Sequence, residues 1–341
     1  MTTTTLAAHH LKVRVTALDR VELQAQMGAS LRGAFFEALW GRFCMNKEAR
    51  ACADCPLMQA CPVSSLVAPL RDERPRIRDV PRPFAIRPPT NHPPSLARGD
   101  SFMFGLTIFG RRLELFPYVV MALRAMGRAG IGQRVEVQGW QRGRFEIAEV
   151  QATNALSGEA KTVVSAQSAQ FIFPDLPTTW TDAERRAATM RADQVALRLL
   201  TPLRLRAQHQ LVTRPLLLPL IERLLERHDF LSMEYGGTPI DKQERLRLIA
   251  LAGQIEIARD DTRWTSLRSY SCRQGRGMSI GGLTGTIVYR GELLPLLPLL
   301  VWGTVIQAGK ATTKGNGVYE IVEDTPPSLS ASVAGNSREA N

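Results

Sequence analysis

Apolar residues follow two different periods along the chain, and these periods predict its strands and helices. Residues 11–17 alternate apolar and polar side chains, as a half-buried strand does. Within 27–40, apolar side chains recur every three or four residues from Leu31 to Leu39, which predicts a helix with Ser30 as its N-cap. A strand followed by an amphipathic helix is therefore expected in this part of the chain.

The rest of the first half is predicted from the same signals. A Pro- and Arg-rich stretch at 71–98 is typical of extended chain, and a helix is expected at 116–126 with Gly127 as its end. Further strands are expected at 101–109, 135–150 and 160–172. This order is close to the split β-α-β arrangement of a ferredoxin-like domain, except that the second helix comes early.

The second half approximately repeats this order of elements after a linker at 174–191. Strands are expected at 195–206, 279–289 and 318–322, and helical segments at 214–231, 243–257 and 293–302. We therefore predict an α+β fold of two tandem ferredoxin-like (RRM-like) domains, spanning 1–175 and 176–323. Residues 324–341 are rich in Ser, Pro, Ala and Asn and are expected to form a disordered tail.

Composition adds a class of partner to this picture. The chain has 43 Lys and Arg residues against 32 Asp and Glu, a formal net charge of +11. This excess favours a polyanionic partner, with nucleic acid ahead of a membrane surface. No apolar run reaches the roughly 18 residues that a membrane span needs. The N-terminal residues also lack the layout of a signal peptide. We therefore expect a soluble, cytoplasmic protein that does not engage a membrane.

A glycine- and lysine-rich segment near the C-terminus is the strongest candidate for contact with that partner. Residues 309–317 read Gly-Lys-Ala-Thr-Thr-Lys-Gly-Asn-Gly. Glycines let a backbone approach a ligand closely and present N–H groups to anions, and Lys310 and Lys314 suit a polyanion. The segment is therefore interpreted as a cradle for a phosphate backbone, although a hairpin loop with solvated charges would show the same pattern.

Four of the five cysteines form a C-x7-C-x2-C-x5-C array, namely Cys44, Cys52, Cys55 and Cys61. A C-x2-C pair with two flanking cysteines fits the tetrahedral four-thiolate site that Zn²⁺ favours. In a reducing cytosol a metal is a more natural use of these thiols than disulfides are. We expect a structural zinc-binding insert at 44–61, with an iron–sulfur cluster or four reduced thiols as alternatives. No catalytic metal is expected, because four cysteines leave no open coordination position.

The order of elements, taken with a series of short motifs, resembles the CRISPR repeat-processing endoribonucleases of the RAMP superfamily. The motifs lie at 31–34, 104–110, 122–132, 201–205, 271–274, 282–285, 289–291 and 309–317, and the cysteine array follows the first of them. Each motif is weak alone, but their order and spacing are fairly specific. The resemblance covers roughly Leu11 to Val322.

The resemblance implies two tandem ferredoxin-like domains that grip a CRISPR repeat RNA. It also implies cleavage of precursor CRISPR RNA without a catalytic metal. The 2′-hydroxyl upstream of the scissile bond attacks the phosphate and leaves a 2′,3′-cyclic phosphate and a 5′-hydroxyl. This chemistry needs a base for the 2′-hydroxyl, an acid for the leaving 5′-oxygen and cations for the charged transition state.

The sequence departs from this family where the catalytic base is expected. Many members place a histidine at or near the first helix, whereas residues 27–43 contain none. His9 and His10 are expected in a flexible terminus, and His228 is expected to be structural at the end of a charged helix. The candidates for catalysis are therefore His209 first, then His92 and Tyr270.

RNA contact is expected from cations in the second half. His209 follows a strand that carries Arg204 and Arg206, which can neutralise a phosphate. The set of predicted RNA-binding residues is Arg204, Arg206, Arg268, Arg273, Arg276, Lys310 and Lys314. Tyr270 lies two residues after Arg268, so on a strand both would share a face, with the ring able to stack on a base.

Three functions are compatible with these observations. The first, which we favour, is the repeat-processing endoribonuclease. The second is a non-catalytic RAMP subunit that holds guide RNA in a CRISPR effector complex with other subunits, and the absence of a histidine from the first helix favours it somewhat. The third is an unrelated basic zinc-binding protein that acts on DNA or as a scaffold.

Overall fold

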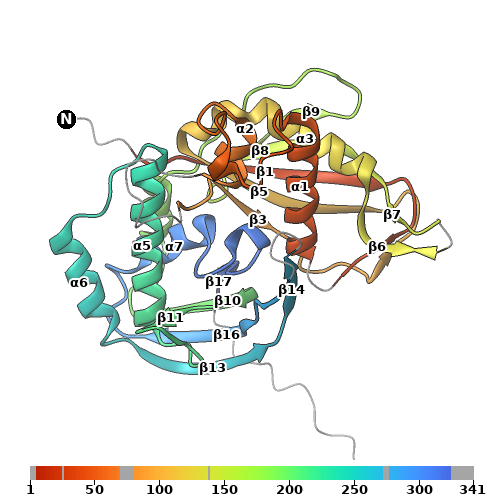
Figure 1. Cartoon of the computed structure of the whole chain (residues 1–341). Helices are drawn as coiled ribbons and strands as arrows, with labels where there is room; N and C mark the ends of the chain where they lie inside the picture. The colour runs from red at the N-terminus through yellow and green to blue at the C-terminus, as the bar shows by residue number, and fades with distance from the viewer. Residues whose placement is uncertain (1–4, 25–26, 70–79, 137–138, 272–275, 324–341) are drawn as a thin grey trace, which may run out of the picture.

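The computed structural model describes residues 5–24, 27–69, 80–136, 139–271 and 276–323. Two antiparallel sheets, each packed against its own helices, form two units that lie against each other (Figure 1). Each unit has its own cluster of buried apolar side chains. The predicted tail, 324–341, lies outside the described residues. Within the described part of the chain, no helix has the length and apolar character that a membrane crossing requires.

The N-terminal sheet has five strands in the order β3-β5-β1-β8-β9. Its strands are β1 (Ala8–Ala17), β3 (Phe84–Arg87), β5 (Ser101–Phe109), β8 (Phe145–Thr153) and β9 (Ala160–Ser165). The helices are α1 (Met27–Phe43), α2 (Pro62–Val67) and α3 (Phe116–Ala129). The apolar spacing in α1 places Leu31, Phe35 and Leu39 in the core, where they are almost fully buried.

The N-terminal domain is ferredoxin-like, and the second helix is not early. The first, second, third and fourth strands of that fold are β1, β3, β5 and β8, and α3 stands in its usual place between the last two. The sequence reading missed β3, which lies inside the Pro- and Arg-rich stretch at 71–98. Only four residues long and flanked by Pro83 and Pro88, this strand pairs with β5 alone.

The C-terminal sheet repeats the arrangement in the order β13-β16-β10-β17. Its strands are β10 (Gln194–Leu203), β13 (Glu256–Thr265), β16 (Gly282–Arg290) and β17 (Tyr319–Val322). The helices are α4 (Trp180–Ala187), α5 (Leu217–Tyr235), α6 (Lys242–Ala252) and α7 (Leu297–Ile306). The sequence reading extended the helical segment to Ile257 and missed β13 altogether. The prediction of two tandem ferredoxin-like domains is confirmed.

Four two-stranded sheets and three 3-10 turns complete the described structure. One sheet pairs the distant β2 (Val21–Glu22) with β4 (Ser95–Leu96). The other three are hairpins, which pair β6 (Ile131–Val135) with β7 (Gln141–Gly143), β11 (Arg206–Ala207) with β12 (Gln210–Leu211), and β14 (Arg268–Ser271) with β15 (Arg276–Ser279). The turns are η1 (Cys52–Asp54), η2 (Gly110–Leu115) and η4 (Thr312–Lys314). The last of these contains the second lysine of the glycine-rich segment.

Two predicted helix boundaries are wrong. Helix α1 begins at Met27, so Ser30 lies inside it and its hydroxyl donates to the Gln24 side chain at 2.9 Å. Helix α3 continues past Gly127 and ends before Gly130, whose φ of +77° suits a glycine. Gly127 instead allows close packing, because a Cβ there would lie 2.2 Å from the Phe145 carbonyl oxygen.

The histidines near the N-terminus belong to the sheet, which corrects the expectation of a flexible terminus. His10 lies in β1, is only 9% exposed, and its Nδ1 lies 2.9 Å from the Thr107 hydroxyl. Burial, and then the nearby Arg87 and Lys12, lower the pKa of His10 to about 3. His228 is structural as predicted, since it is buried and its Nδ1 accepts a hydrogen bond from the Trp302 indole at 3.1 Å.

Polar contacts between the two domains fix their relative placement. The buried Gln307 amide donates to the Ile86 carbonyl in β3 at 2.9 Å. The Tyr235 hydroxyl at the end of α5 donates to the Pro81 carbonyl. These contacts place the glycine-rich segment of the C-terminal domain beside α1 of the N-terminal domain, as the blue and red ribbons of Figure 1 show.

Candidate active site

The glycine-rich segment meets the first turn of α1 at a contact that two glycines permit. A Cβ built on Gly28 would lie 2.1 Å from the Lys314 carbonyl oxygen. On the other side, a Cβ built on Gly315 would lie 2.6 Å from Pro88 Cδ, and the φ of Gly315 is +80°. Neither position accepts a larger residue unless the backbone moves. The two domains therefore touch through backbone at this point, with side chains from both on either side.

The glycine-rich segment is held in one shape by hydrogen bonds to the C-terminal domain. Lys310 N–H donates to the Arg204 carbonyl at 3.0 Å, and Gly317 N–H donates to the Pro202 carbonyl at 3.1 Å. The Asn316 side chain is fully buried and donates to the Ile280 carbonyl at 2.6 Å. A buried side-chain amide that has a hydrogen-bond partner stabilises the loop in this conformation. The loop is thus a preformed surface on the end of β10.

Lys314 is the cation that this loop places at the domain junction. Its side chain is half-buried and lines a cavity of about 300 Å³ together with Arg32 of α1 and Arg50 (the Lys314 cavity). Burial lowers the pKa of Lys314, and the positive charges of Arg32 and Arg82 lower it further. A lysine whose charged form is disfavoured in this way gives up its proton more readily than a solvated one.

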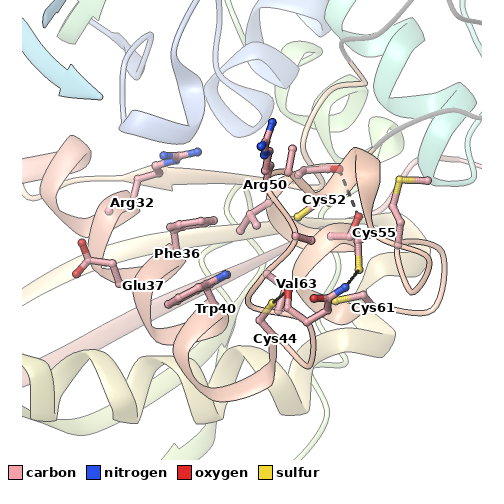
Figure 2. Close-up of a pocket in the computed structure, with 18 of the residues that line it drawn as sticks. Arg32, Phe36, Glu37, Trp40, Cys44, Arg50, Cys52, Cys55, Cys61 and Val63 are labelled. Carbon is pink, nitrogen blue, oxygen red and sulfur yellow. Dashed lines mark hydrogen bonds between the residues drawn. The ribbon is translucent and has the colours of Figure 1, made fainter. Parts of the chain in front are cut away.

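The walls of the Lys314 cavity come from α1 and from the cysteine loop. Figure 2 shows Arg32 and Arg50 at the side of the cavity nearest the C-terminal domain, with Phe36 and Trp40 along its floor. The Arg32 guanidinium lies 5.8 Å from the centre of the Phe36 ring, and the Lys47 ammonium lies 5.4 Å from the centre of the Trp40 ring. Cations and aromatic rings together are the groups that bind the phosphates and bases of single-stranded RNA.

A second cavity lies on the other side of the Gly28–Gly315 contact. It has a volume of about 240 Å³ and is lined by His92, Gly28, Gly315 and Asn316, among others (the His92 cavity). The His92 side chain is partly exposed, and its Nδ1 lies 3.0 Å from the Pro93 carbonyl oxygen, so Nδ1 is protonated when the ring is neutral. Nε2 is then the acceptor, and the structure brings this histidine to the glycine-rich segment.

His209 stands on a different part of the surface. It forms the tip of the β11–β12 hairpin, where Gln208 and His209 have φ angles of +49° and +65°. Consecutive residues with positive φ are typical of a tight type I′ turn. The side chain is exposed. It follows the first strand of the second domain, as predicted, but it does not line either cavity at the Gly28–Gly315 contact.

Among the other predicted RNA-binding residues, the structure describes the side chains of Arg204, Arg206, Arg268 and Lys310. The Arg204 guanidinium donates to the Gly281 carbonyl at 2.8 Å and lies 5.9 Å from the centre of the Trp264 ring. Arg206, Arg268 and Lys310 are exposed. Tyr270 and Arg276 lie on the β14–β15 hairpin, but their side chains fall outside the described part of the structure, and Arg273 falls outside it entirely.

The cysteine array surrounds one end of the Lys314 cavity. Cys44, Cys52, Cys55 and Cys61 all line the cavity and are half-buried, and none of the four is in a disulfide (Figure 2). The Cys44 thiol donates to the Asn46 carbonyl at 3.4 Å, and the Asn46 amide donates to the Cys55 sulfur at 3.8 Å. In the described residues, no three His, Cys, Asp or Glu side chains lie close enough together to hold a metal ion.

Comparison with known proteins identifies the family. Residues 197–319 match the model of the CRISPR-associated endoribonuclease Cas6 family, and residues 6–175 match a model described as an N-terminal domain. The C-terminal domain is Cas6-like. The prediction of a RAMP-type CRISPR endoribonuclease family is therefore confirmed.

Solved Cas6 structures share the tandem fold of this chain. A Cas6 product complex is 16% identical, covers 92% of this chain and 100% of its own, and superposes with a TM-score of 0.54. The Cas6 of Thermus thermophilus is 15% identical, covers 93% and 99%, and has a TM-score of 0.52. A partial Cas6-RT-Cas1–Cas2 complex is 14% identical, covers 93% and 46%, and has a TM-score of 0.55. No curated protein matches the sequence.

Sequence reasoning did not select the residues that surround Lys314 in this Cas6-like fold. In the sequence, Arg32 stands out only as part of the motif at 31–34, and no pattern marks Arg50 or Arg82. All three charges come from the N-terminal domain, whereas Lys314 belongs to the C-terminal one. The sequence signal that could have indicated this site is Arg32 together with Gly28 and Gly33 in the first helix, where a histidine was expected.

Proposed function

We propose that the chain is an endoribonuclease that binds precursor CRISPR RNA and cleaves it within the repeat. The family match over 197–319 and the tandem fold support this function. The observation that carries it is the placement of Lys314, on a preformed glycine-rich loop, across from Arg32 of α1. Phosphodiester cleavage needs preorganised cations at the phosphate, and this is where the fold concentrates them.

The proposed reaction is an internal transesterification. The 2′-oxygen upstream of the scissile bond attacks phosphorus, the bond from phosphorus to the 5′-oxygen breaks, and the products carry a 2′,3′-cyclic phosphate and a 5′-hydroxyl. The 2′-hydroxyl proton goes to a base, and the leaving 5′-oxygen takes up a proton. No metal takes part in these steps. Arg32 and Lys314 stabilise the extra negative charge, and Lys314 donates the proton to the leaving oxygen.

The base is assigned to His92 ahead of His209 and Tyr270. His92 lines the second cavity together with Gly315, and a neutral ring with Nδ1 protonated presents Nε2 as a proton acceptor. Because Lys314 lines the other cavity, the scissile phosphate would have to sit at the Gly28–Gly315 contact, with the 2′-hydroxyl towards His92 and the leaving oxygen towards Lys314. His209 is on an exposed hairpin tip and fits a role in RNA binding. The RNA strand would continue from the glycine-rich loop over Lys310 and Arg204 towards the β14–β15 hairpin, which begins at Arg268.

The deciding experiment is cleavage of repeat RNA in EDTA under single-turnover conditions, with analysis of the product ends. We expect one cut that leaves a 2′,3′-cyclic phosphate. Lys314→Ala should slow the rate by about 10²–10³-fold, the usual range for a lost preorganised charge-stabilising group. Lys314→Arg should keep RNA affinity and still lose most of the rate, because a guanidinium does not release its proton near neutral pH.

Matched variants separate catalysis from binding. His92→Ala should lower the rate, whereas His209→Ala should leave it within a few-fold of the wild type. Lys161→Ala is the charge control, because Lys161 pairs with Asp175 far from the loop in the sequence and lines neither cavity. Wild-type cleavage by Lys314→Ala would refute the site. Tight binding of repeat RNA without any cut would instead indicate a subunit that holds guide RNA.

Other CRISPR proteins are proposed as further partners. The partial Cas6-RT-Cas1–Cas2 complex includes a chain of similar fold, and this chain corresponds to 46% of it. We propose that this protein likewise works beside other CRISPR subunits. Co-purification of tagged protein from its host, before and after ribonuclease treatment, measures whether such partners bind through protein or through RNA.

A further inference from the structure

We propose that Cys44, Cys52, Cys55 and Cys61 bind one Zn²⁺ as four thiolates, and that this zinc holds the loop 44–61 as a wall of the Lys314 cavity. All four side chains line that one cavity. They come from a segment that is fixed at both ends. Cys44 N–H donates to the Trp40 carbonyl at the end of α1, and the Cys61 carbonyl accepts from Ser65 N–H in α2.

The loop between these ends has no apolar core of its own. Met45 is 84% exposed and Leu57 is 48% exposed, although both are large apolar side chains. The backbone makes only short turns, such as the 3-10 turn at Cys52–Asp54. A segment with so little burial gains little from the hydrophobic effect. A metal bound by side chains spread along it supplies the missing cross-link.

The ligand set selects the metal. Four thiolates with a C-x2-C pair at their centre match a closed tetrahedral zinc site. Asn46 already connects two of them, because its carbonyl accepts from Cys44 and its amide donates to Cys55. In the described structure no three of the four thiols lie close enough together to hold an ion. Zinc binding would therefore have to draw the loop together, with the metal in the bridging position that Asn46 now occupies. Each thiol loses its proton when it becomes a ligand.

Zinc binding in the loop should act on the RNA site through Arg50. This residue lies between Cys44 and Cys52 in the sequence, and Figure 2 shows it on the same side of the cavity as Arg32. A loop closed by zinc keeps this guanidinium over the cavity, whereas an open loop lets it move away. The proposed zinc is therefore structural, and it acts on the RNA site by fixing the position of the Arg50 guanidinium.

The first test is metal content, which does not depend on RNA cleavage. Full-length protein purified without added chelator should contain about one zinc per chain by mass spectrometry of the elements. Cobalt exchanged into the protein should give the thiolate charge-transfer bands of a tetrahedral site. Cys55→Ser should lose both signals. The matched control is Cys272→Ser, which changes the one cysteine outside the array and should keep both.

The second test measures the loop itself. Chelation should make the wild-type chain sensitive to trypsin after Lys47 and Arg50, and added zinc should restore protection. Cys55→Ser should be sensitive from the start. Repeat-RNA affinity should fall about as much in Cys55→Ser as in Arg50→Ala, while Cys272→Ser binds like the wild type.

Three results would overturn the proposal. They are no bound metal in protein saturated with zinc, iron with acid-labile sulfide in place of zinc, or equal loss of metal in Cys55→Ser and Cys272→Ser. Failure of RNA cleavage with zinc present and the loop protected would count against the endoribonuclease alone. The two proposals are therefore tested separately.

Discussion

Replacing Gly28 by alanine tests the contact on which the candidate site depends. Alanine is normally the better helix residue, and a glycine inside a helix costs roughly 0.5–1 kcal/mol relative to it. Gly28 lies in the first turn of α1 and Gly41 near its other end. A Cβ at Gly41 meets nothing within 4 Å, whereas a Cβ at Gly28 would lie 2.1 Å from the Lys314 carbonyl oxygen and 2.8 Å from its carbonyl carbon.

The magnitude follows from that distance. An ordinary contact to a Cβ begins at 3.4 Å, so helix and loop must separate by about 1.3 Å. Both atoms belong to the backbone and no rotamer relieves the clash. Overpacking of this kind costs about 1–3 kcal/mol, against a gain of at most about 1 kcal/mol from helix propensity. We expect Gly28→Ala to lower the free energy of unfolding by about 1–2 kcal/mol and Gly41→Ala to leave it unchanged or raise it slightly.

Cleavage should respond more strongly than stability. A displacement of about 1 Å between catalytic groups can cost on the order of 10² in rate, and here it moves Lys314 away from Arg32. Urea unfolding and single-turnover cleavage of repeat RNA are measured for the wild type, Gly28→Ala and Gly41→Ala. If Gly28→Ala matches Gly41→Ala in both measurements, the close approach of α1 to the glycine-rich loop is not what builds the site.

Three further predictions concern acid stability, the domain interface and RNA contact. The buried His10 has a pKa of about 3 and stays neutral in the folded protein. In the unfolded chain this histidine takes up a proton below about pH 6.5. The free energy of unfolding should therefore fall by about 2 kcal/mol on account of His10 as the pH drops from 7 to 5. Urea midpoints plotted against pH should be flatter in His10→Gln than in the wild type, and an equal slope in both would contradict this reasoning. Tyr235→Phe removes the hydroxyl that donates to Pro81 across the domains and should cost about 1 kcal/mol in urea unfolding; no loss would mean that this bond does not hold the domains. Lys310→Ala should reduce the slope of log affinity for repeat RNA against log salt concentration by about 0.7–0.9, the value for one lost phosphate contact. Lys161→Ala should leave that slope unchanged. An unchanged slope in Lys310→Ala would mean that Lys310 contacts solvent and not RNA.

Most of the fold was predictable from sequence, and the missed strands of the two main sheets lie at one edge of each. The central strands alternate or run apolar and were found, as for 101–109, which coincides with β5. The two missed strands, β3 and β13, are the edge strands next to β5 and β16. An edge strand pairs with a neighbour on one side only. This allows the prolines that flank β3, and it allows the charged residues along β13, whose side chains are mostly exposed. Neither strand needs the alternation that reveals a strand buried on one face.

The candidate site was only half predictable, because it is made where the two domains meet. Local composition marked the glycine-rich loop and its lysines, and the structure places that loop at the domain junction. Composition also ranked His209 above His92, since two arginines precede it in sequence. That ranking compared neighbours along the chain, whereas Gly315 lies beside His92 and Gly28 through folding alone. The charges that lower the pKa of Lys314, Arg32 and Arg82, likewise belong to the other domain. When each domain supplies part of a site, no sequence pattern within one domain can predict the whole of it. The clearest sign of this site in the sequence is the pair Gly28 and Gly315, which lets the two backbones touch.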